Sequence, residues 1–310
     1  AITVNRRLYW ELQLPIRGAS VDPRPGERVL RAEDNLYDPK QLVHRALFSN
    51  IVSSDFYSGS LVGDDERLAL RVVYDATQAP ELKPLVSAIE SFRFYRSYNL
   101  FGLRRNGSLH NSDVYVNSSG ENTFAVLRNW RDRRELQPKY DFVLRGLRSA
   151  FPEFFDDIEF VGAGQTISVN LFAPKSDQSV PLYFAPNGWL TGLLHLCAVA
   201  GAQPGSLIAI DEMENTLHPF AIRQLTAAFR EWSEEHDVTV CLASHSPVLL
   251  DEFQDDPARV FVMEHGQSNL PVPLTELRDR EWLAQFSLGR LYAHGEFGSQ
   301  QADTAPASAN

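Results

Sequence analysis

Hydrophobic and polar residues alternate near the start of the chain. Between residues 8 and 14, every second position is a leucine or a tryptophan, which is the period-two pattern of a strand with one buried face. The apolar run Leu68–Tyr74 predicts another strand, and a short helical pattern lies over residues 41–48. We therefore predict a β-rich part over residues 1–79.

The spacing of hydrophobic residues changes to three and four from Pro80 onward. This spacing predicts three helices, which begin near Pro80, Phe124 and Tyr140, and the third ends before Pro152. We therefore interpret residues 80–160 as an inserted, mainly helical lobe.

Strands and helices alternate in the rest of the chain. Strands are predicted over 160–173, 180–185, 206–210, 238–243 and 259–264, with helices over 188–202 and 219–234. The strands near 208 and 240 are continuously apolar, so we expect both to be buried on both faces of a parallel sheet. The pattern predicts an α/β core over 161–298, with ligands at the carboxyl ends of its strands. The polar residues 299–310 are predicted to be a disordered tail.

Composition narrows the class of protein. The chain has 310 residues and 44% hydrophobic content, enough for a sizeable core, but no apolar run of the roughly 18 residues that a membrane span needs. Its two cysteines, Cys197 and Cys241, lie in apolar segments, so we interpret both as core residues of a cytoplasmic protein. The first residues do not resemble a signal peptide.

The charge is negative overall but unevenly distributed. The net charge of −11 argues against a protein that coats nucleic acid, although ten arginines and one lysine against five acidic residues give a local +6 between residues 93 and 148. These arginines could hold DNA phosphates, or they could form a solvated helix face that pairs with acidic residues. They are Arg93, Arg96, Arg104, Arg105, Arg128, Arg131, Arg133, Arg134, Arg145 and Arg148.

Two adjacent carboxylates, Asp211 and Glu212, follow the predicted strand near 208. In a phosphate-processing site the first could hold Mg²⁺, which prefers one or two carboxylates together with phosphate oxygens. The second could polarise the water that attacks the γ-phosphate. An acidic helix start would give the same pair of residues.

A second polar strand end follows about 30 residues later, at Ser244 and His245. A parallel crossover through the intervening helix would place His245 beside the carboxylates. There it could contact a γ-phosphate oxygen, although a strand end or helix cap would also account for these residues.

These two segments resemble motifs of ABC-type ATPases of the RecF/SMC-like branch. Residues 211–219, Asp-Glu-Met-Glu-Asn-Thr-Leu-His-Pro, are similar to the Walker B and D-loop pattern, and residues 244–247, Ser-His-Ser-Pro, to the switch-histidine motif. The resemblance covers about 180–295, including Leu-Gly-Arg-Leu-Tyr at 288–292. It implies a P-loop NTPase-like sheet and an ATP-driven homodimer with ATP and Mg²⁺ between the protomers. Asp211 would then be the metal ligand, Glu212 and His245 catalytic residues and Ser244 a nucleotide contact.

The family's signature loop corresponds to residues 185–189, Ala-Pro-Asn-Gly-Trp. The resemblance implies that Asn187 and Gly188 contact the nucleotide of the other protomer. Gly188 would let backbone approach a phosphate, although a plain turn glycine would look the same. Pro186 stands where the family has serine, which departs from the pattern.

The sequence contains no G-x-x-x-x-G-K-[ST] motif, which would cradle the β-phosphate. In this family the motif precedes the matching region. Because the chain begins with Ala1, we expect the P-loop upstream of it; a P-loop on a separate chain or a degenerate ATPase are the other interpretations.

Three functions are compatible with these residues. The first is an ATPase that acts on DNA or on a partner such as an effector nuclease, since related stand-alone ATPases are linked with DNA repair or phage defence. The second is a pseudo-ATPase that binds nucleotide, DNA or protein as a scaffold. The third, a metal or serine hydrolase that uses Asp211, His218 and His245, is disfavoured because neither H-x-x-x-H nor G-x-S-x-G occurs.

Overall fold

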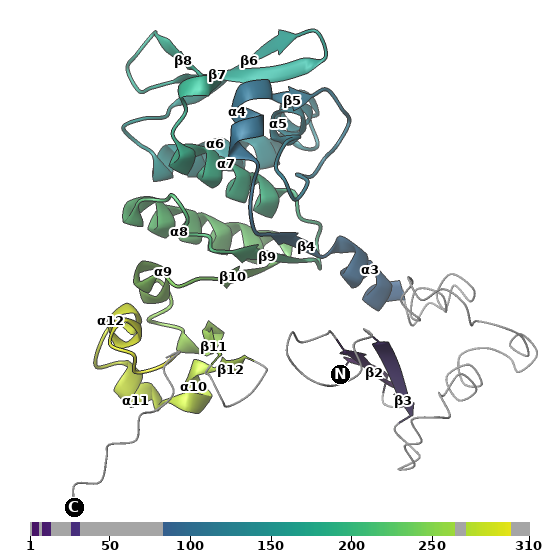
Figure 1. Cartoon of the computed structure of the whole chain (residues 1–310), viewed down its shortest axis with the longest axis vertical. Helices are drawn as coiled ribbons and strands as arrows, with labels where there is room; N and C mark the ends of the chain where they lie inside the picture. Colours follow the sequence, from purple (N-terminus) through teal and green to yellow (C-terminus); the bar gives the residue numbers. More distant parts are fainter. Residues whose placement is uncertain (1, 6–7, 14–25, 32–82, 264–270, 299–310) are drawn as a thin grey trace, which may run out of the picture. The chain divides into compact units, whose positions relative to one another are not determined.

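The computed structural model describes residues 2–5, 8–13, 26–31, 83–263 and 271–298 (Figure 1). The chain divides into two compact units, Ala1–Ser91 and Phe92–Asn310, which are described separately. Among the described helices, none combines the length and the apolarity needed to cross a lipid bilayer.

The first unit contains an antiparallel meander and one helix. Its strands β1 (Ile2–Asn5), β2 (Leu8–Gln13) and β3 (Gly26–Arg31) pair in chain order, and α3 spans Lys83–Ser91. The strand predicted near residue 8 and the helix predicted from Pro80 are therefore confirmed. The strand predicted over Leu68–Tyr74 and the helix predicted over 41–48 lie outside the described residues.

A parallel sheet forms the centre of the second unit. Its strands are β4 (Arg93–Tyr95), β9 (Leu207–Asp211) and β10 (Thr239–Ala243), in the order β10-β9-β4. Both β4 and β10 run parallel to β9. The two apolar strands of the sequence are thus neighbours, whereas β4 lies in the segment that we predicted to be helical.

The expectation that β9 and β10 are buried on both faces is wrong for this unit. Ile208 and Ile210 are at most 1% exposed, but Leu207 is 38% exposed and Phe94, on neighbouring β4, is 49% exposed. Cys241 on β10 is also exposed, contrary to its interpretation as a core residue. The reason is that the described helices of this unit pack on the face that carries Ile208 and Ile210.

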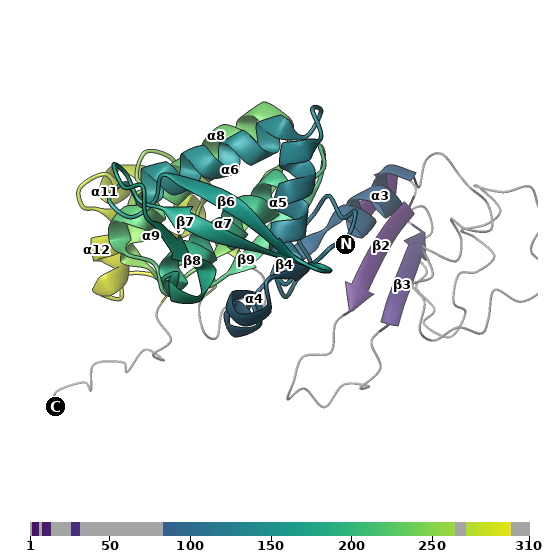
Figure 2. The same ribbon diagram turned by 90° about the horizontal axis from the view of Figure 1, so that it is seen from above.

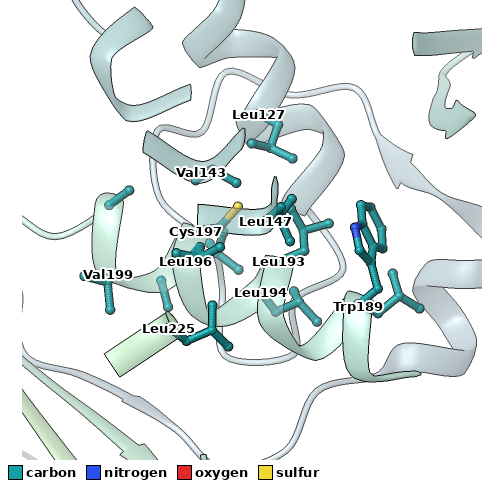
Figure 3. Packing of buried hydrophobic residues seen from close by; sticks show 14 of the residues in the cluster. Leu127, Val143, Leu147, Trp189, Leu193, Leu194, Leu196, Cys197, Val199 and Leu225 are labelled. Atoms are coloured by element: carbon teal, nitrogen blue, oxygen red, sulfur yellow. The ribbon is translucent and has the colours of Figure 1, made fainter. Parts of the chain in front are cut away.

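The main core lies between this sheet face and a set of helices. These are α5 (Thr123–Asp132), α6 (Gln137–Ala150), α7 (Asn187–Ala200) and α8 (Pro219–His236). Helix α7 is apolar on all sides, and every residue from Trp189 to Ala200 is buried, as expected of a central helix. Its side chains, including the confirmed core residue Cys197, pack against α5, α6 and α8 (Figure 3).

An antiparallel sheet covers the other side of these helices (Figure 1). It consists of β5 (Ser108–Leu109), β6 (Asp157–Ala163), β7 (Thr166–Phe172) and β8 (Ser179–Pro181), with β7 central. Alternate residues of β7 are buried. The single strand predicted over 160–173 is therefore a hairpin, because Gly164 takes a positive φ of 61° at its turn. The strand predicted over 180–185 is short and continues into a 3₁₀ helix, Leu182–Phe184.

Short elements complete the second unit. They are α4 (Leu100–Asn106), α9 (Pro247–Asp251), η2 (Pro257–Arg259), β11 (Phe261–Val262), β12 (Val272–Pro273), α10 (Leu274–Leu277), α11 (Arg280–Leu283) and α12 (Leu288–Ala293). The elements from β11 onward form a small core of their own around Leu274, Leu283 and Leu288. This C-terminal core lies beside α9, as Figures 1 and 2 both show.

Many of the arginines between residues 93 and 148 have partners inside the second unit. Arg145 and Arg148 pair with acidic residues, and the guanidinium of Arg131 lies over the Phe160 ring, 4.5 Å from its centroid. Such exposed pairs contribute little to stability. They do show, however, that part of this charge is balanced within the protein.

Candidate active site

The predicted site residues begin where β9 and β10 end. Because the two strands are parallel and Ala243 is paired with Asp211, both strands end at the same edge of the sheet. The Glu212 N–H extends the ladder by donating to the Ala243 carbonyl at 2.9 Å. The structure thus brings the Asp211–Glu212 segment beside the Ser244–His245 segment, as the crossover argument predicted.

Glu214 joins the two segments. Its carboxylate accepts hydrogen bonds from the Ser244 hydroxyl and from the His245 backbone N–H, both at 2.8 Å. The Ser244 hydroxyl oxygen in turn accepts from the Ser246 N–H at 2.9 Å. Glu214 belongs to the Walker B-like motif, but the sequence pattern alone did not assign it a role. Its position as a third carboxylate close to Asp211 and Glu212 was the feature of the sequence that could have indicated one.

Glu212 has an unusual backbone. Its φ is +52°, a left-handed conformation that non-glycine residues rarely adopt. The side chain is exposed, and its Oε2 accepts a hydrogen bond from the Asn215 side-chain amide at 2.9 Å. Among the described residues Oε1 has no hydrogen-bond partner, so one carboxylate oxygen faces solvent.

His245 contacts the C-terminal core of the second unit. Its Nδ1 lies 2.9 Å from the hydroxyl of Tyr292 on α12, and its ring is exposed. The same helix also packs closely on the segment after His245. Gly289 lies so near α9 that a Cβ there would be 2.2 Å from the Pro247 carbonyl oxygen. Tyr292 is the last residue of the segment 288–292 included in the resemblance, but the sequence did not indicate its contact with His245.

Asp211 is paired with an arginine. Its Oδ2 lies 3.4 Å from Nε of Arg96, whose side chain is 76% exposed against 30% for Asp211. Such an exposed pair is weak and can open. The described residues contain no cluster of three or more His, Cys, Asp or Glu side chains that could hold a metal. The Asp211 carboxylate fits Mg²⁺, which needs only one or two protein carboxylates beside phosphate oxygens.

Asn187 and Gly188 lie at the start of α7, apart from these residues. No described hydrogen bond or ion pair joins either of them to Asp211, Glu212, Ser244 or His245. Asn187 Oδ1 accepts a hydrogen bond from Nη2 of Arg104, which also donates to the Ala185 carbonyl at 2.9 Å. Gly188 has a role within its own chain, since a Cβ there would lie 2.7 Å from the Thr216 carbonyl oxygen.

His218 does not join the site. Its Nδ1 accepts a hydrogen bond from the Phe220 N–H at 3.2 Å, so it caps the N-terminus of α8. Residues 212–216 form turns instead of a helix, so no helix face brings His218 together with the carboxylates that precede it. This arrangement gives no support to a hydrolase that combines Asp211, His218 and His245.

A second histidine, His195, lies beneath the site and was not predicted to matter. It is 3% exposed, with Nε2 at 3.2 Å from the Met213 carbonyl oxygen and Nδ1 at 3.0 Å from the Tyr98 hydroxyl. Burial lowers its pKa to about 4, although the bond to Met213 opposes that change. The ring is therefore neutral at pH 7.

A parallel sheet with carboxylates after one strand and a histidine after the next is the arrangement of an ABC-type, SMC-like AAA ATPase domain with a P-loop NTPase-like fold. A family model described as "AAA domain, putative AbiEii toxin, Type IV TA system" matches residues 46–251, more than half of the 310-residue chain. The chain belongs to this family. The predicted fold class and the resemblance to ABC-type ATPases are thereby confirmed.

Two solved structures that match the chain are SMC heads bound to parts of ScpA. The first, an SmcHead with the C-winged helix domain of ScpA, has 8% identity and a TM-score of 0.31 over 41% of this chain and 43% of that chain. The second, the Smc head with an extended coiled coil from Pyrococcus furiosus, has 10% identity and a TM-score of 0.28 over 74% and 65%. The chain spans less than two thirds of either head. A comparison with curated proteins gives no match.

Proposed function

We propose that this protein hydrolyses ATP at the edge of the sheet where β9 and β10 end. The observation that carries this proposal is the hydrogen bonding of Glu214 to Ser244 and His245, because it fixes the two polar segments to each other. A γ-phosphate placed at this edge would meet a carboxylate on one side and an imidazole on the other. Packing alone does not require these polar groups at two neighbouring strand ends.

Glu212 is the general base of the proposed reaction. Its Oε1 accepts a proton from the water that attacks the γ-phosphorus, while the bond from that phosphorus to the β–γ bridging oxygen breaks and ADP leaves. Asn215 holds the other carboxylate oxygen at 2.9 Å and so limits rotation of the side chain. A base held in this way is already oriented before the substrate binds.

His245 donates a hydrogen bond to a γ-phosphate oxygen in this proposal. When the Tyr292 hydroxyl donates to Nδ1, the ring proton is on Nε2, which then becomes the donor toward the nucleotide. The Ser244 hydroxyl is committed to Glu214, so we propose that Ser244 acts by holding the backbone of this segment in addition to any nucleotide contact.

Asp211 is the residue that would hold Mg²⁺. When bound, the ion would neutralise charge on the β- and γ-phosphate oxygens. The exposed Arg96 side chain has to leave the Asp211 carboxylate when the carboxylate takes up this role.

The proposed active form is a homodimer with ATP between the protomers. Asn187 and Gly188 lie at the start of α7 without contacts to the strand-end residues of their own chain, so each is available to face a second copy. We propose that Gly188 of the partner subunit approaches the γ-phosphate, with the N-terminus of that subunit's α7 favouring the negative charge. Gly188 is partly exposed and Asn187 is exposed, as this contact requires.

Mg²⁺-dependent ATP hydrolysis by the purified protein tests this proposal. We expect Glu212→Gln to lower kcat by about 100-fold or more while nucleotide binding persists, since general bases contribute about 10²–10⁴-fold. Glu153→Gln, at an exposed carboxylate in the turn after α6, is the matched control and should leave kcat unchanged. Equal hydrolysis by wild type and Glu212→Gln would contradict the proposal.

A pseudo-ATPase scaffold is the second candidate function. It is favoured by the Arg96 guanidinium, which lies beside the Asp211 carboxylate where the proposed ATPase would need a metal ion. The same assay separates the two functions, because a scaffold would bind nucleotide, DNA or protein without Mg²⁺-dependent turnover in any version of the chain.

We further propose that nucleotide turnover changes how tightly the dimer binds DNA or an effector protein such as a nuclease. For DNA, the support comes from Arg105, Arg133 and Arg134, which have no described partner within the second unit. Phosphate contacts through these arginines would make DNA binding weaken steeply with added salt. DNA binding that is insensitive to salt, or equal after their replacement by alanine, would contradict this part.

A further inference from the structure

The loop that follows β9 contains two left-handed residues that are not glycine. Glu212 has a φ of 52° and Thr216 a φ of 65°. Such conformations are unfavourable for residues with a side chain and persist only where the surrounding structure holds them. The loop that carries the proposed general base therefore needs contacts that fix its backbone.

One side of α7 supplies three of these contacts. Gly188 lets the helix approach the Thr216 carbonyl, where a Cβ would come within 2.7 Å. The hydroxyls of Thr191 and Thr216 lie 3.0 Å apart, and Nε2 of His195 lies 3.2 Å from the Met213 carbonyl oxygen. Positions 188, 191 and 195 are three and four residues apart, so they lie on one face of the helix. This face follows the loop from Thr216 back to the residue next to Glu212.

The hydrogen bonds of His195 define its tautomer. A carbonyl oxygen only accepts, so Nε2 carries the ring proton and donates it to Met213. Nδ1 therefore accepts, and the Tyr98 hydroxyl, 3.0 Å away, is the donor. The Met213 side chain is itself fully buried, which anchors this point of the loop from a second direction.

An apolar side chain would suit position 195 better if packing were its only role. The rest of α7 from Leu193 to Ala200 is otherwise hydrophobic, and an imidazole costs free energy to bury unless both nitrogens are hydrogen-bonded. Here both are bonded, one of them to the residue directly after Glu212. The chain thus places a directional donor beneath the left-handed residue of the site.

We propose that His195, oriented by Tyr98, is a positioning residue that holds the Met213 carbonyl and through it the backbone conformation of Glu212. This inference rests on the proposed ATP hydrolysis by Glu212. It assigns a role in that reaction to two residues that act through the backbone of the loop.

Steady-state kinetics of ATP hydrolysis by the purified protein tests the role. We expect His195→Leu to lower kcat about tenfold with little change in the KM for ATP, because the base is misplaced while the nucleotide-binding groups stay intact. His195→Gln, whose amide can donate to the Met213 carbonyl, should recover most of the loss. Tyr98→Phe should lower kcat about threefold, since it removes the orienting donor and keeps the shape of the ring.

Thr226→Val is the matched control. Thr226 is 3% exposed on α8 and donates to the Ile222 carbonyl at 2.8 Å, so this change also removes a buried polar group, but away from the loop. It should leave kcat unchanged. A fall in kcat equal to that of His195→Leu would show a general effect of core destabilisation and would overturn the inference.

Nitrogen NMR of the imidazole gives a readout that does not depend on activity. We expect the proton on Nε2 of His195 in the wild type, and a loss of this preference in Tyr98→Phe. A proton on Nδ1 would overturn the inference, and so would an unchanged kcat in both His195→Leu and Tyr98→Phe. If Glu212→Gln retains full hydrolysis, the proposed function itself fails, and that result is separate from the outcome of the His195 variants.

Discussion

The two parts of the proposed site differ in how firmly their own chain holds them. At the ends of β9 and β10, Glu214 binds both Ser244 and His245, and Asn215 binds Glu212. At the start of α7, the Asn187 side chain is held only by Arg104 among the described residues, and Gly188 packs closely against the Thr216 carbonyl without a hydrogen bond.

This difference indicates that the strand ends and the start of α7 have different roles. The strand-end residues are held to one another by hydrogen bonds within one chain, so in the proposed homodimer they would be oriented before a second copy binds. The start of α7 carries exposed residues, which would face the partner subunit in that dimer. Variants that affect one part and spare the other therefore test this difference.

The largest effect is expected at Glu214. Glu214→Ala removes the acceptor for the Ser244 hydroxyl and for the His245 N–H, and hydrogen bonds to charged groups contribute about 1.5–3 kcal/mol each. Because the carboxylate is partly exposed, we expect a total loss of about 2–3 kcal/mol in the free energy of unfolding, measured with urea. Glu153→Ala is the control, and a loss below about 0.5 kcal/mol for Glu214→Ala would show that the strand ends are not held by this residue.

The next effect is a pH dependence caused by His195. Burial lowers its pKa to about 4 from an ordinary value near 6.5, so the unfolded chain binds a proton before the folded one does. The part of the free energy of unfolding that depends on a neutral His195 is therefore fully present above about pH 6.5, and it is lost as the pH falls toward 4. Between pH 7.5 and pH 5 this loss amounts to about 2 kcal/mol.

Urea unfolding of wild type and His195→Leu at both pH values isolates this contribution. The variant is less stable at pH 7.5, but its stability should fall by about 2 kcal/mol less than that of the wild type on going to pH 5. Parallel losses in the two proteins would mean that His195 is not buried as a neutral ring. That outcome would weaken the support of the Glu212 loop by α7.

The smallest effect is expected at the start of α7. Gly188→Ala places a methyl group 2.7 Å from the rigid Thr216 carbonyl, while alanine favours the helix, so we expect a net loss of about 1 kcal/mol. Gly162→Ala is the control, since a Cβ there meets nothing within 4 Å and its φ is not positive. A loss at Gly188 as large as that at Glu214 would remove the contrast between the two parts.

Periodic and continuous apolar segments allowed much of the fold to be predicted. The helices α5 to α8 and the adjacent strands β9 and β10 follow from local patterns, which hold because burial repeats along each element. Strand β4 is only three residues long and was missed, because it is defined by pairing with β9 more than 100 residues away. The sequence pattern predicts one strand where the structure has the hairpin of β6 and β7, because these two strands are similarly apolar.

The neighbouring positions of the candidate site residues could be predicted where polar residues directly follow apolar strands. On this pattern Asp211, Glu212, Ser244 and His245 were expected to lie at one edge of the sheet, and the structure brings their two segments together. Tyr292 and Arg96 were not assigned roles, since each meets the site through tertiary packing. His195 was hidden for a physical reason: a histidine in an apolar helix has the same sequence pattern whether it is a filled core position or a hydrogen-bonded support.

The separate C-terminal core has a consequence for truncation of the gene. Val262, Leu274 and Leu288 pack in a cluster of their own, and this cluster carries the tyrosine that meets His245. A stop codon shortly before residue 288 would leave the main core intact and still remove that tyrosine. Such an allele would leave the His245 imidazole without its hydrogen-bond partner and would also remove three buried side chains of the cluster, Leu288, Leu291 and Phe297.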